Sequence, residues 1–371
     1  MTSKPIFVTV PHLPPLEEFL PYLQEIWANK WLTNNGPMHQ RLESELADFL
    51  GVPFVCLTNN ATNGLMLALR ALNISGEVLT TPYSFVATSH SIAWQGAVPV
   101  FIDIDPTTLN LDPRQIEASI TPRTTAIMPV HCYGTPCDVD AIDGIAAKHG
   151  LKVIYDAAHA FGVKCHCGSV LNHGDLSVLS FHATKVFTTF EGGAIICQTA
   201  AMKQRIDLLK NFGIESETVT SDIGMNAKMA EINAAFGLLQ LKSVEGAILA
   251  RKQVAMQYLE GLDGVAGITP VQNVSATGLN YGYFPILVGR PYRLTRDELH
   301  AQLKENNLFA RRYFYPLLSD FPMYSGLPSS QRQNLPVAVD AADRILCLPI
   351  FPGIGKESVA RVLQLIQAGS A

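Results

Sequence analysis

The chain has 371 residues, 48% of them hydrophobic, and a formal net charge of -5, from 27 Lys and Arg against 32 Asp and Glu. This length is enough for two domains, and the lack of a long basic run argues against a nucleic-acid-binding surface. The N-terminal stretch MTSKPIFVTVPHLPPLEEFL is broken by prolines, and no later stretch approaches the roughly 20 apolar residues of a membrane helix, so we expect a cytoplasmic protein without a membrane partner.

The first half of the chain alternates short apolar runs with helix-like stretches. The runs are PFVCLT, EVLTTP, VPVFIDI, TAIMPVH, LKVIYDA, LSVLSF and GAIICQ. Between several of them lie amphipathic segments such as NGLMLALRAL and DAIDGIAAKHG, and the second ends on a glycine, as helices often do. This alternation predicts an α/β domain with a mostly parallel sheet, in which ligands bind at the carboxyl ends of the strands.

The second half has a different pattern. Residues 226–262 keep a helical period without an internal proline, which predicts a long helix or a helix pair. After it, YGYFPILVG and ILCLPIF are typical of strands, whereas TRDELHAQLKENN and KESVARVLQLIQAG are typical of helices. The last helix would carry one apolar face, formed by Val359, Val362, Leu363 and Ile366. We predict a large domain over residues 1–245, which includes the N-terminal segment, and a smaller α+β domain over residues 246–371.

The cysteines indicate neither disulfides nor a metal centre. Their number is odd, seven, and several lie inside apolar runs, where a thiol behaves as a small hydrophobic group. The segments KCHCGS and HCYGTPC lack the paired CxxC spacing of zinc sites. We therefore expect no metal site.

A phosphate-binding helix start is predicted where the first apolar run ends. The run PFVCLT is followed by small polar residues and then at once by a helix-like segment. The opening N–H groups of a helix have no partner within it and lie at the positive end of its dipole, which suits a phosphate. Ala61 and Thr62 are the candidate donors, although an ordinary helix cap explains the same pattern.

Two further candidates are Asp156, at the end of LKVIYDA, and Lys185, between LSVLSF and GAIICQ. A buried carboxylate needs a cation or several hydrogen-bond donors, and a helix cap or a salt bridge would satisfy it equally well. A buried lysine loses its proton readily and can attack a carbonyl, although most lysines simply extend into water. Together, an amine, an acid and a phosphate site are what pyridoxal phosphate requires: the lysine binds its aldehyde and the acid pairs with its ring nitrogen.

Several motifs in the same order resemble one known family. These are WLTNNGPMHQRLESELADFLGV, TPYSFVATSHSIAWQGAVPVFIDID, YDAAHAFG, SFHATK followed by EGGA, and GMNAKMAEINAAFGLLQL, with RRYFYP and CLPIFPG nearer the C-terminus. They are similar to the sugar-nucleotide aminotransferases of the DegT/DnrJ/EryC1/StrS family, which are fold-type-I pyridoxal-phosphate enzymes. The resemblance implies an aspartate-aminotransferase-like fold with a mixed, mostly parallel seven-stranded sheet and a smaller C-terminal domain.

The resemblance also implies roles for individual residues. Lys185 matches the Schiff-base lysine, which acts as general base and acid, and Asp156 matches the aspartate opposite the pyridine nitrogen. Asn226 matches an asparagine that reaches the phosphate from the neighbouring subunit, so each active site would be shared in a homodimer; the alternative is a cap of the following helix. The remaining cofactor contacts would be Phe85 stacking on the ring, His159 at the ring hydroxyl and Ser180 at the phosphate. Arg312, Tyr313 and Tyr315 resemble the substrate-binding stretch.

The implied reaction is a transamination between L-glutamate and a nucleotide-linked keto sugar, with pyridoxamine phosphate as the intermediate form of the cofactor. SFHATKVFTTFEGG resembles the enzymes that aminate C-4 more than those that aminate C-3, and among them those that use dTDP-4-keto-6-deoxy-D-glucose. GDP-perosamine synthesis and C-3 amination are the alternatives within the family. A non-catalytic regulator that only binds the cofactor is the alternative of a different class.

Overall fold

The computed structural model describes residues 4–166, 168–271 and 278–369. Its centre is a seven-stranded sheet in the order β2-β10-β9-β6-β5-β3-β4. The strands are β2 (Phe54–Thr58), β3 (Glu77–Thr80), β4 (Val98–Phe101), β5 (Thr124–Met128), β6 (Lys152–Asp156), β9 (Leu176–Ser180) and β10 (Gly193–Cys197). β10 runs antiparallel to both of its neighbours and the other pairs are parallel. This confirms the mixed, mostly parallel sheet, and each of the predicted runs forms one strand.

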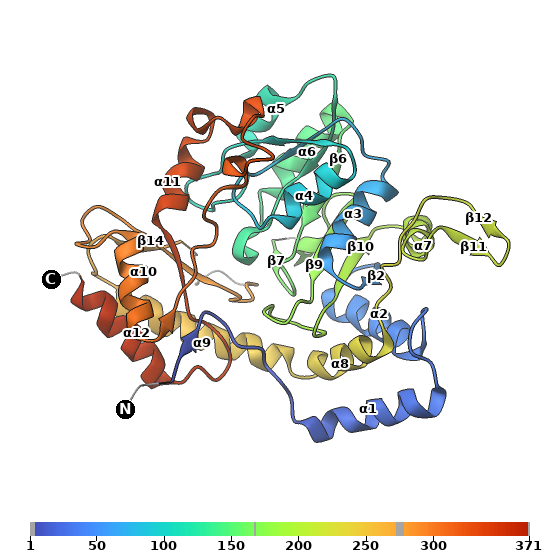
Figure 1. Cartoon of the computed structure of the whole chain (residues 1–371), viewed down its shortest axis with the longest axis horizontal. Helices are drawn as coiled ribbons and strands as arrows, with labels where there is room; N and C mark the ends of the chain where they lie inside the picture. Colours follow the sequence, from blue (N-terminus) through green and yellow to red (C-terminus); the bar gives the residue numbers. More distant parts are fainter. Residues whose placement is uncertain (1–3, 167, 272–277, 370–371) are drawn as a thin grey trace.

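Helices cover both faces of this sheet (Figure 1). One face packs against α2 (Pro37–Leu50), α6 (Val139–His149) and α8 (Glu231–Leu241), and the other against α3 (Ala61–Ala71), α4 (Ala87–Trp94) and α7 (Ala200–Leu209). Alternate residues of a strand belong to opposite faces: Ile196 contacts the first helix layer and Ile195 the second. Strands buried on both faces read as continuous apolar runs, which is why the sequence indicated them clearly.

A smaller antiparallel sheet follows, formed by β13 (Ile268–Pro270), β14 (Phe284–Val288) and β16 (Ile345–Leu348). Beside it lie α9 (Val244–Leu262), α10 (Arg296–Glu305), α11 (Pro336–Arg344) and α12 (Lys356–Ala368). Val359, Val362 and Ile366 of α12 are fully buried, and Leu363 is partly buried against the same cluster. The two strands and two helices predicted in this half are therefore confirmed.

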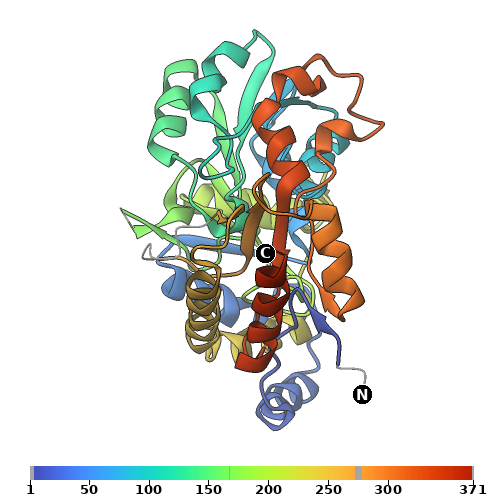
Figure 2. The ribbon, with the colours of Figure 1, turned by 90° about the vertical axis from the view of Figure 1, so that its left-hand side faces the viewer.

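The helical stretch predicted over residues 226–262 is a pair, α8 and α9, which lie end to end below the large sheet (Figure 1). The pair begins at Glu231, five residues later than the periodicity suggested, and residues 226–230 form no helix. α1 (Leu16–Asn29) lies at the lower edge of the molecule in both views (Figures 1 and 2). β1 (Ile6–Phe7) pairs in parallel with β15 (Leu308–Phe309), so the chain start contacts the C-terminal half. The boundary after residue 245 stays a prediction.

The remaining short elements are α5 (Ile116–Ser119), the hairpin β7 (Lys164–Cys165) and β8 (Gly168–Ser169), and the hairpin β11 (Ile214–Ser216) and β12 (Val219–Thr220). The β11–β12 hairpin projects from the body of the molecule beside α7 (Figure 1). In the part of the chain that the structure describes, no helix combines the length and the apolar character that crossing a membrane requires.

Candidate active site

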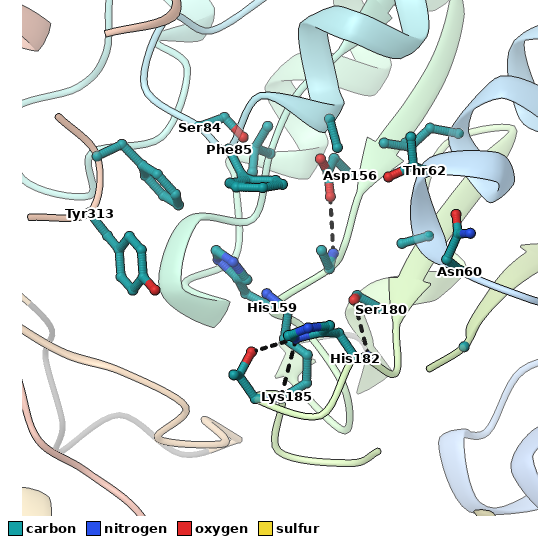
Figure 3. Close-up of a pocket in the computed structure, with 18 of the residues that line it drawn as sticks. Asn60, Thr62, Ser84, Phe85, Asp156, His159, Ser180, His182, Lys185 and Tyr313 are labelled. Atoms are coloured by element: carbon teal, nitrogen blue, oxygen red, sulfur yellow. Dashed lines mark hydrogen bonds between the residues drawn. The ribbon is translucent and has the colours of Figure 1, made fainter. Parts of the chain in front are cut away.

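A cavity of about 480 Å³ opens where β2, β6 and β9 end, a size typical of small-molecule sites. Its walls come from the start of α3, the turn before α4, the turn after β6 and the β9–β10 loop. Tyr283, Tyr313 and Phe314 of the C-terminal half close it, and Figure 3 shows Tyr313 among them. The ligand site predicted at the carboxyl ends of the strands is therefore present as a cavity.

The start of α3 forms one wall of this cavity. Asn60 caps the helix, and its side-chain oxygen accepts a hydrogen bond from the Asn63 N–H at 2.8 Å. Ala61 and Thr62 are the first two helical residues and line the cavity, so their N–H groups have no partner within the helix. Gly193 on β10 permits this geometry, because a Cβ at that position would lie 2.8 Å from the Ala61 nitrogen. The wall presents unpaired donors at the positive end of a helix, which suits a phosphate.

Asp156 is the last residue of β6 and is only 5% exposed. Its Oδ2 accepts a hydrogen bond from the Thr88 hydroxyl at 2.7 Å, and its Oδ1 accepts one from the Ala158 N–H at 3.1 Å. Ser84 is hydrogen-bonded to Thr88 in turn, at 2.7 Å. Burial raises the pKa of Asp156, although these donors and the charge of Lys185 oppose the shift. The carboxyl group is thus fixed in orientation, and a cationic ligand atom in the cavity would offset its burial.

Lys185 lies in the loop between β9 and β10, and its side chain lines the cavity (Figure 3). We expected a buried lysine; the residue is half-buried, because it faces the cavity instead of lying between strands. Its Nζ donates a hydrogen bond to the Tyr283 hydroxyl at 3.1 Å. Burial lowers the pKa of Lys185 to about 8, and the attraction of Asp156 only partly opposes this. A larger fraction of this amine is therefore neutral near pH 7 than of an exposed lysine.

His159, Ser180 and Phe85 also line the cavity, as the sequence predicted. Burial holds the pKa of His159 well below its usual value, so the ring is neutral. Its Nδ1 accepts the backbone N–H of Tyr133 at 3.1 Å, which leaves the proton on Nε2 as a hydrogen-bond donor. The Phe85 ring is 60% exposed and faces the cavity (Figure 3), where it can cover a flat ligand. These positions fit the implied contacts, whereas the roles themselves stay predictions.

Three predicted residues do not line this cavity. Asn226 is exposed, and it does not cap the helix that follows, because the cap position of α8 is Ala230. Arg312 forms a salt bridge with Asp297 at 2.9 Å, and Tyr315 stacks against the Arg312 guanidinium. Of the three residues predicted to bind substrate, only Tyr313 lines the cavity; Phe314, between Tyr313 and Tyr315, lines it as well.

Sequence reasoning missed several residues that line the cavity or contact its lining residues. Tyr283, which contacts Lys185, was read only as part of a strand, and Thr88, which contacts Asp156, as part of a motif. His182 lies two residues after the end of β9; its Nδ1 is 2.8 Å from the Thr184 hydroxyl, and its Nε2 is 3.6 Å from Glu191. The SFHATK motif could have indicated His182, since it stands in the same loop as Lys185. Nothing in the sequence indicates Tyr283, because only the tertiary fold brings it to the lysine.

Comparison with known proteins gives consistent results. The model of the DegT/DnrJ/EryC1/StrS aminotransferase family matches residues 16–367. A dTDP-4-amino-4,6-dideoxy-D-glucose transaminase from Shigella dysenteriae is 56% identical over 98% of this chain and 99% of its own length. A GDP-perosamine synthase from Caulobacter vibrioides is 33% identical over 92% of each chain. The crystal structure of DesI in the presence of its TDP-sugar product superposes with a TM-score of 0.94, at 35% identity over 99% of this chain and 93% of the other.

Proposed function

We propose a substrate for this chain, which belongs to the DegT/DnrJ/EryC1/StrS aminotransferase family. The enzyme would move an amino group from L-glutamate to C-4 of dTDP-4-keto-6-deoxy-D-glucose. The product is dTDP-4-amino-4,6-dideoxy-D-glucose. The chain is a transaminase that depends on pyridoxal phosphate and has the fold-type-I architecture. The observation that carries the substrate proposal is the 56% identity to the Shigella dysenteriae enzyme along nearly the whole chain. GDP-perosamine synthesis is less well supported, at 33% identity.

The cavity residues fit the cofactor. The N–H groups of Ala61 and Thr62 would hold the phosphate together with Ser180, and Asp156 would pair with the pyridine nitrogen. The Nε2–H of His159 would donate to the ring hydroxyl, and Phe85 would stack on the ring. When bound, the cofactor supplies an electron sink for the carbon that loses its proton. The fixed orientation of Asp156 keeps a negative charge beside that ring.

Lys185 would move the proton in both halves of the reaction. Its neutral amine can take a proton from Cα of the donor, and its ammonium form can give a proton to C-4 of the sugar. A pKa of about 8 suits both tasks, because each form is populated near neutral pH. The Tyr283 hydroxyl, 3.1 Å from Nζ, would hold the amine at the cavity while it is not bound to the aldehyde.

The active site would be shared between two subunits. Among the described residues that line the cavity, Lys185 is the only lysine or arginine, whereas a glutamate donor carries two carboxylates. Exposed apolar side chains lie on and near the projecting β11–β12 hairpin: Phe212, Ile214, Val219 and Ile223. A homodimer would cover them and would bring Asn226 to the partner's cavity. Mixing inactive Lys185→Ala and Asn226→Ala subunits should restore part of the activity, whereas no recovery would refute a shared site.

We also propose that the enzyme works in the cytoplasm and supplies an aminosugar for a surface polysaccharide such as O-antigen. The decisive test is incubation with glutamate and a panel of dTDP-, UDP- and GDP-linked keto sugars, with the new amine located by NMR. Amination at C-4 of the dTDP sugar is the expected result. Preference for the GDP sugar, or amination at C-3, would select the corresponding alternative. A protein whose visible spectrum does not change with glutamate would be a cofactor-binding regulator.

A further inference from the structure

A second cluster of reactive groups lies outside the cavity, beside the β7–β8 hairpin. Of the cysteines that the structure describes, five are buried: Cys56, Cys132, Cys137, Cys197 and Cys347. Cys165, on β7, is the one that is partly exposed. The proposed cofactor and substrate site makes no use of it, because Cys165 does not line the cavity.

Cys165 is placed next to a base that is itself oriented by an acid. Its Sγ lies 3.5 Å from Nε2 of His173, and Nδ1 of the same ring lies 3.2 Å from Oδ2 of Asp143. His173 follows the short helical turn after β8, and Asp143 lies on α6, so three separate segments bring the groups together. The His173 side chain is 14% exposed, which limits its motion. A nucleophile, a base and a group that orients the base are the arrangement that activates thiols in enzymes.

A metal ion explains this cluster less well. Within the described ranges, no group of three or more His, Cys, Asp or Glu side chains is arranged to hold a metal ion. His166, although adjacent to Cys165 in sequence, has its Nε2 3.5 Å from Asp140. The Asp143 carboxylate contacts the far nitrogen of His173, so it could not bind the same ion as Nε2 and the sulfur.

We propose that Cys165 is a site of thiol–disulfide exchange with small-molecule disulfides, with His173 as its general base and Asp143 as a positioning residue. His173 takes the proton of the Cys165 thiol, and the thiolate attacks one sulfur of the small disulfide. The bond between Cys165 and that sulfur forms as the original S–S bond breaks. The departing thiolate takes the proton from His173, so one disulfide is consumed, one mixed disulfide is formed and no other oxidant is needed.

The test uses the complete enzyme with its cofactor and glutathione disulfide as the probe. The rate of adduct formation is followed by intact mass, and the modified cysteine is located by peptide mapping. The native enzyme should gain one adduct at Cys165, and Cys165→Ser should remove it without changing transaminase activity. His173→Gln should slow the reaction by at least about tenfold, since a general base typically contributes more than that. An adduct at Cys167 or at a buried cysteine, in place of Cys165, would overturn the proposal.

His166→Gln is the matched control, because it removes a histidine adjacent to the thiol that contacts Asp140 instead. It should leave the rate within about twofold, and an equal loss in both histidine variants would show a general effect of charge, not a base. Asp143→Asn should slow the reaction, and Asp143→Glu should restore part of the rate, which mere damage to the fold would not do. Each variant is first compared with the native enzyme by circular dichroism. If His173→Gln is folded and reacts at the native rate, the proposal is wrong.

Discussion

Lys210 and Lys185 are both shielded from bulk water, but their pKa values are shifted in opposite directions. Lys210, at the end of α7, is 4% exposed, and its Nζ lies 2.6 Å from Asp207 and 3.3 Å from Glu43. Lys185 faces the cavity, and within the described residues no carboxylate lies within salt-bridge distance of it. Burial lowers the pKa of both amines, but around Lys210 the two carboxylates outweigh burial and raise its pKa, whereas the pKa of Lys185 falls to about 8.

Burial alone does not lower the pKa of a lysine enough for it to act as a base. A buried lysine with adjacent carboxylates is a permanent cation that holds the fold together. The Glu43 carboxylate also contacts Lys203 at 2.7 Å and accepts the Leu57 N–H at 2.9 Å, so the cluster ties α2 and α7 to β2. A lysine kept apart from carboxylates can release its proton, at some cost to stability.

Removing the amine of Lys185 should have the largest effect. Lys185→Ala should lower the rate of transamination by about 10⁴-fold, the upper range for an acid–base group, because Lys185 is the only amine among the described residues that line the cavity. The melting temperature of the cofactor-free protein should stay level or rise. The NMR assay and thermal denaturation measure the two effects. A variant that retains more than a few per cent of the native rate would exclude the assigned role.

Lys210→Met should act in the opposite sense. It leaves Asp207 and Glu43 without their most buried cation, so the free energy of unfolding should fall by about 3–5 kcal/mol. The rate per folded, cofactor-loaded molecule should stay within a few-fold of native. Urea denaturation measures the loss, and Lys203→Met is the matched control: this lysine contacts the same two carboxylates but is 26% exposed, so its loss should be smaller. Equal losses would mean that burial does not set the contribution.

The pH dependence of stability sharpens the contrast. In the cofactor-free protein the Lys185 pKa is about 8 against an ordinary 10.5, so between these values the unfolded chain binds more protons. The penalty for burying the ammonium, about 3 kcal/mol, is therefore fully present below pH 8 and is relieved as the pH rises to 10.5. Lys185→Met should be more stable than native at pH 7, and this difference should close by pH 10.5 in urea denaturation.

The stability contribution of Lys210 should change with pH in the opposite direction, since the pKa of Lys210 is raised. Its contribution to stability is fully present below pH 10.5 and is lost as the pH rises through the raised value. The difference between native and Lys210→Met should thus stay constant from pH 7 to pH 10 and shrink only above that. If both variants changed in parallel with pH, the two lysines would not differ as described.

The smallest expected effect concerns the contact that holds Lys185. Tyr283→Phe removes one hydrogen bond of 3.1 Å and keeps the ring, so we expect a loss of about 1 kcal/mol, or about fivefold in kcat. KM for the sugar should change little, because the hydroxyl contacts the lysine. Steady-state kinetics separate the two constants. A change confined to KM would instead make Tyr283 a substrate contact.

The sequence predicts the large sheet and the strand-end residues for the same reason. Strands buried on both faces are uninterrupted apolar runs, and parallel strands end at one edge, so Asp156, Ser180 and Ala61 had to converge. Tyr283 could not be foreseen, because its position depends on how the C-terminal half packs on the large sheet. Lys210 stands three residues after Asp207 in a helix-like segment, so the sequence could have indicated that pair. Glu43 is 167 residues away from Lys210, and only the fold brings the two together.

The lack of a side chain at Gly193 couples strand β10 to the start of α3. This residue lies on β10, the one strand of the seven-stranded sheet that runs antiparallel to its neighbours, and a methyl group at this position would collide with the Ala61 nitrogen in the first turn of α3. A substitution at Gly193 would therefore disturb both β10 and the N–H groups at the start of α3 that would hold the phosphate. In descendants of this chain, position 193 should remain glycine for as long as phosphate is held there, even where the sugar pocket has been rebuilt for another substrate.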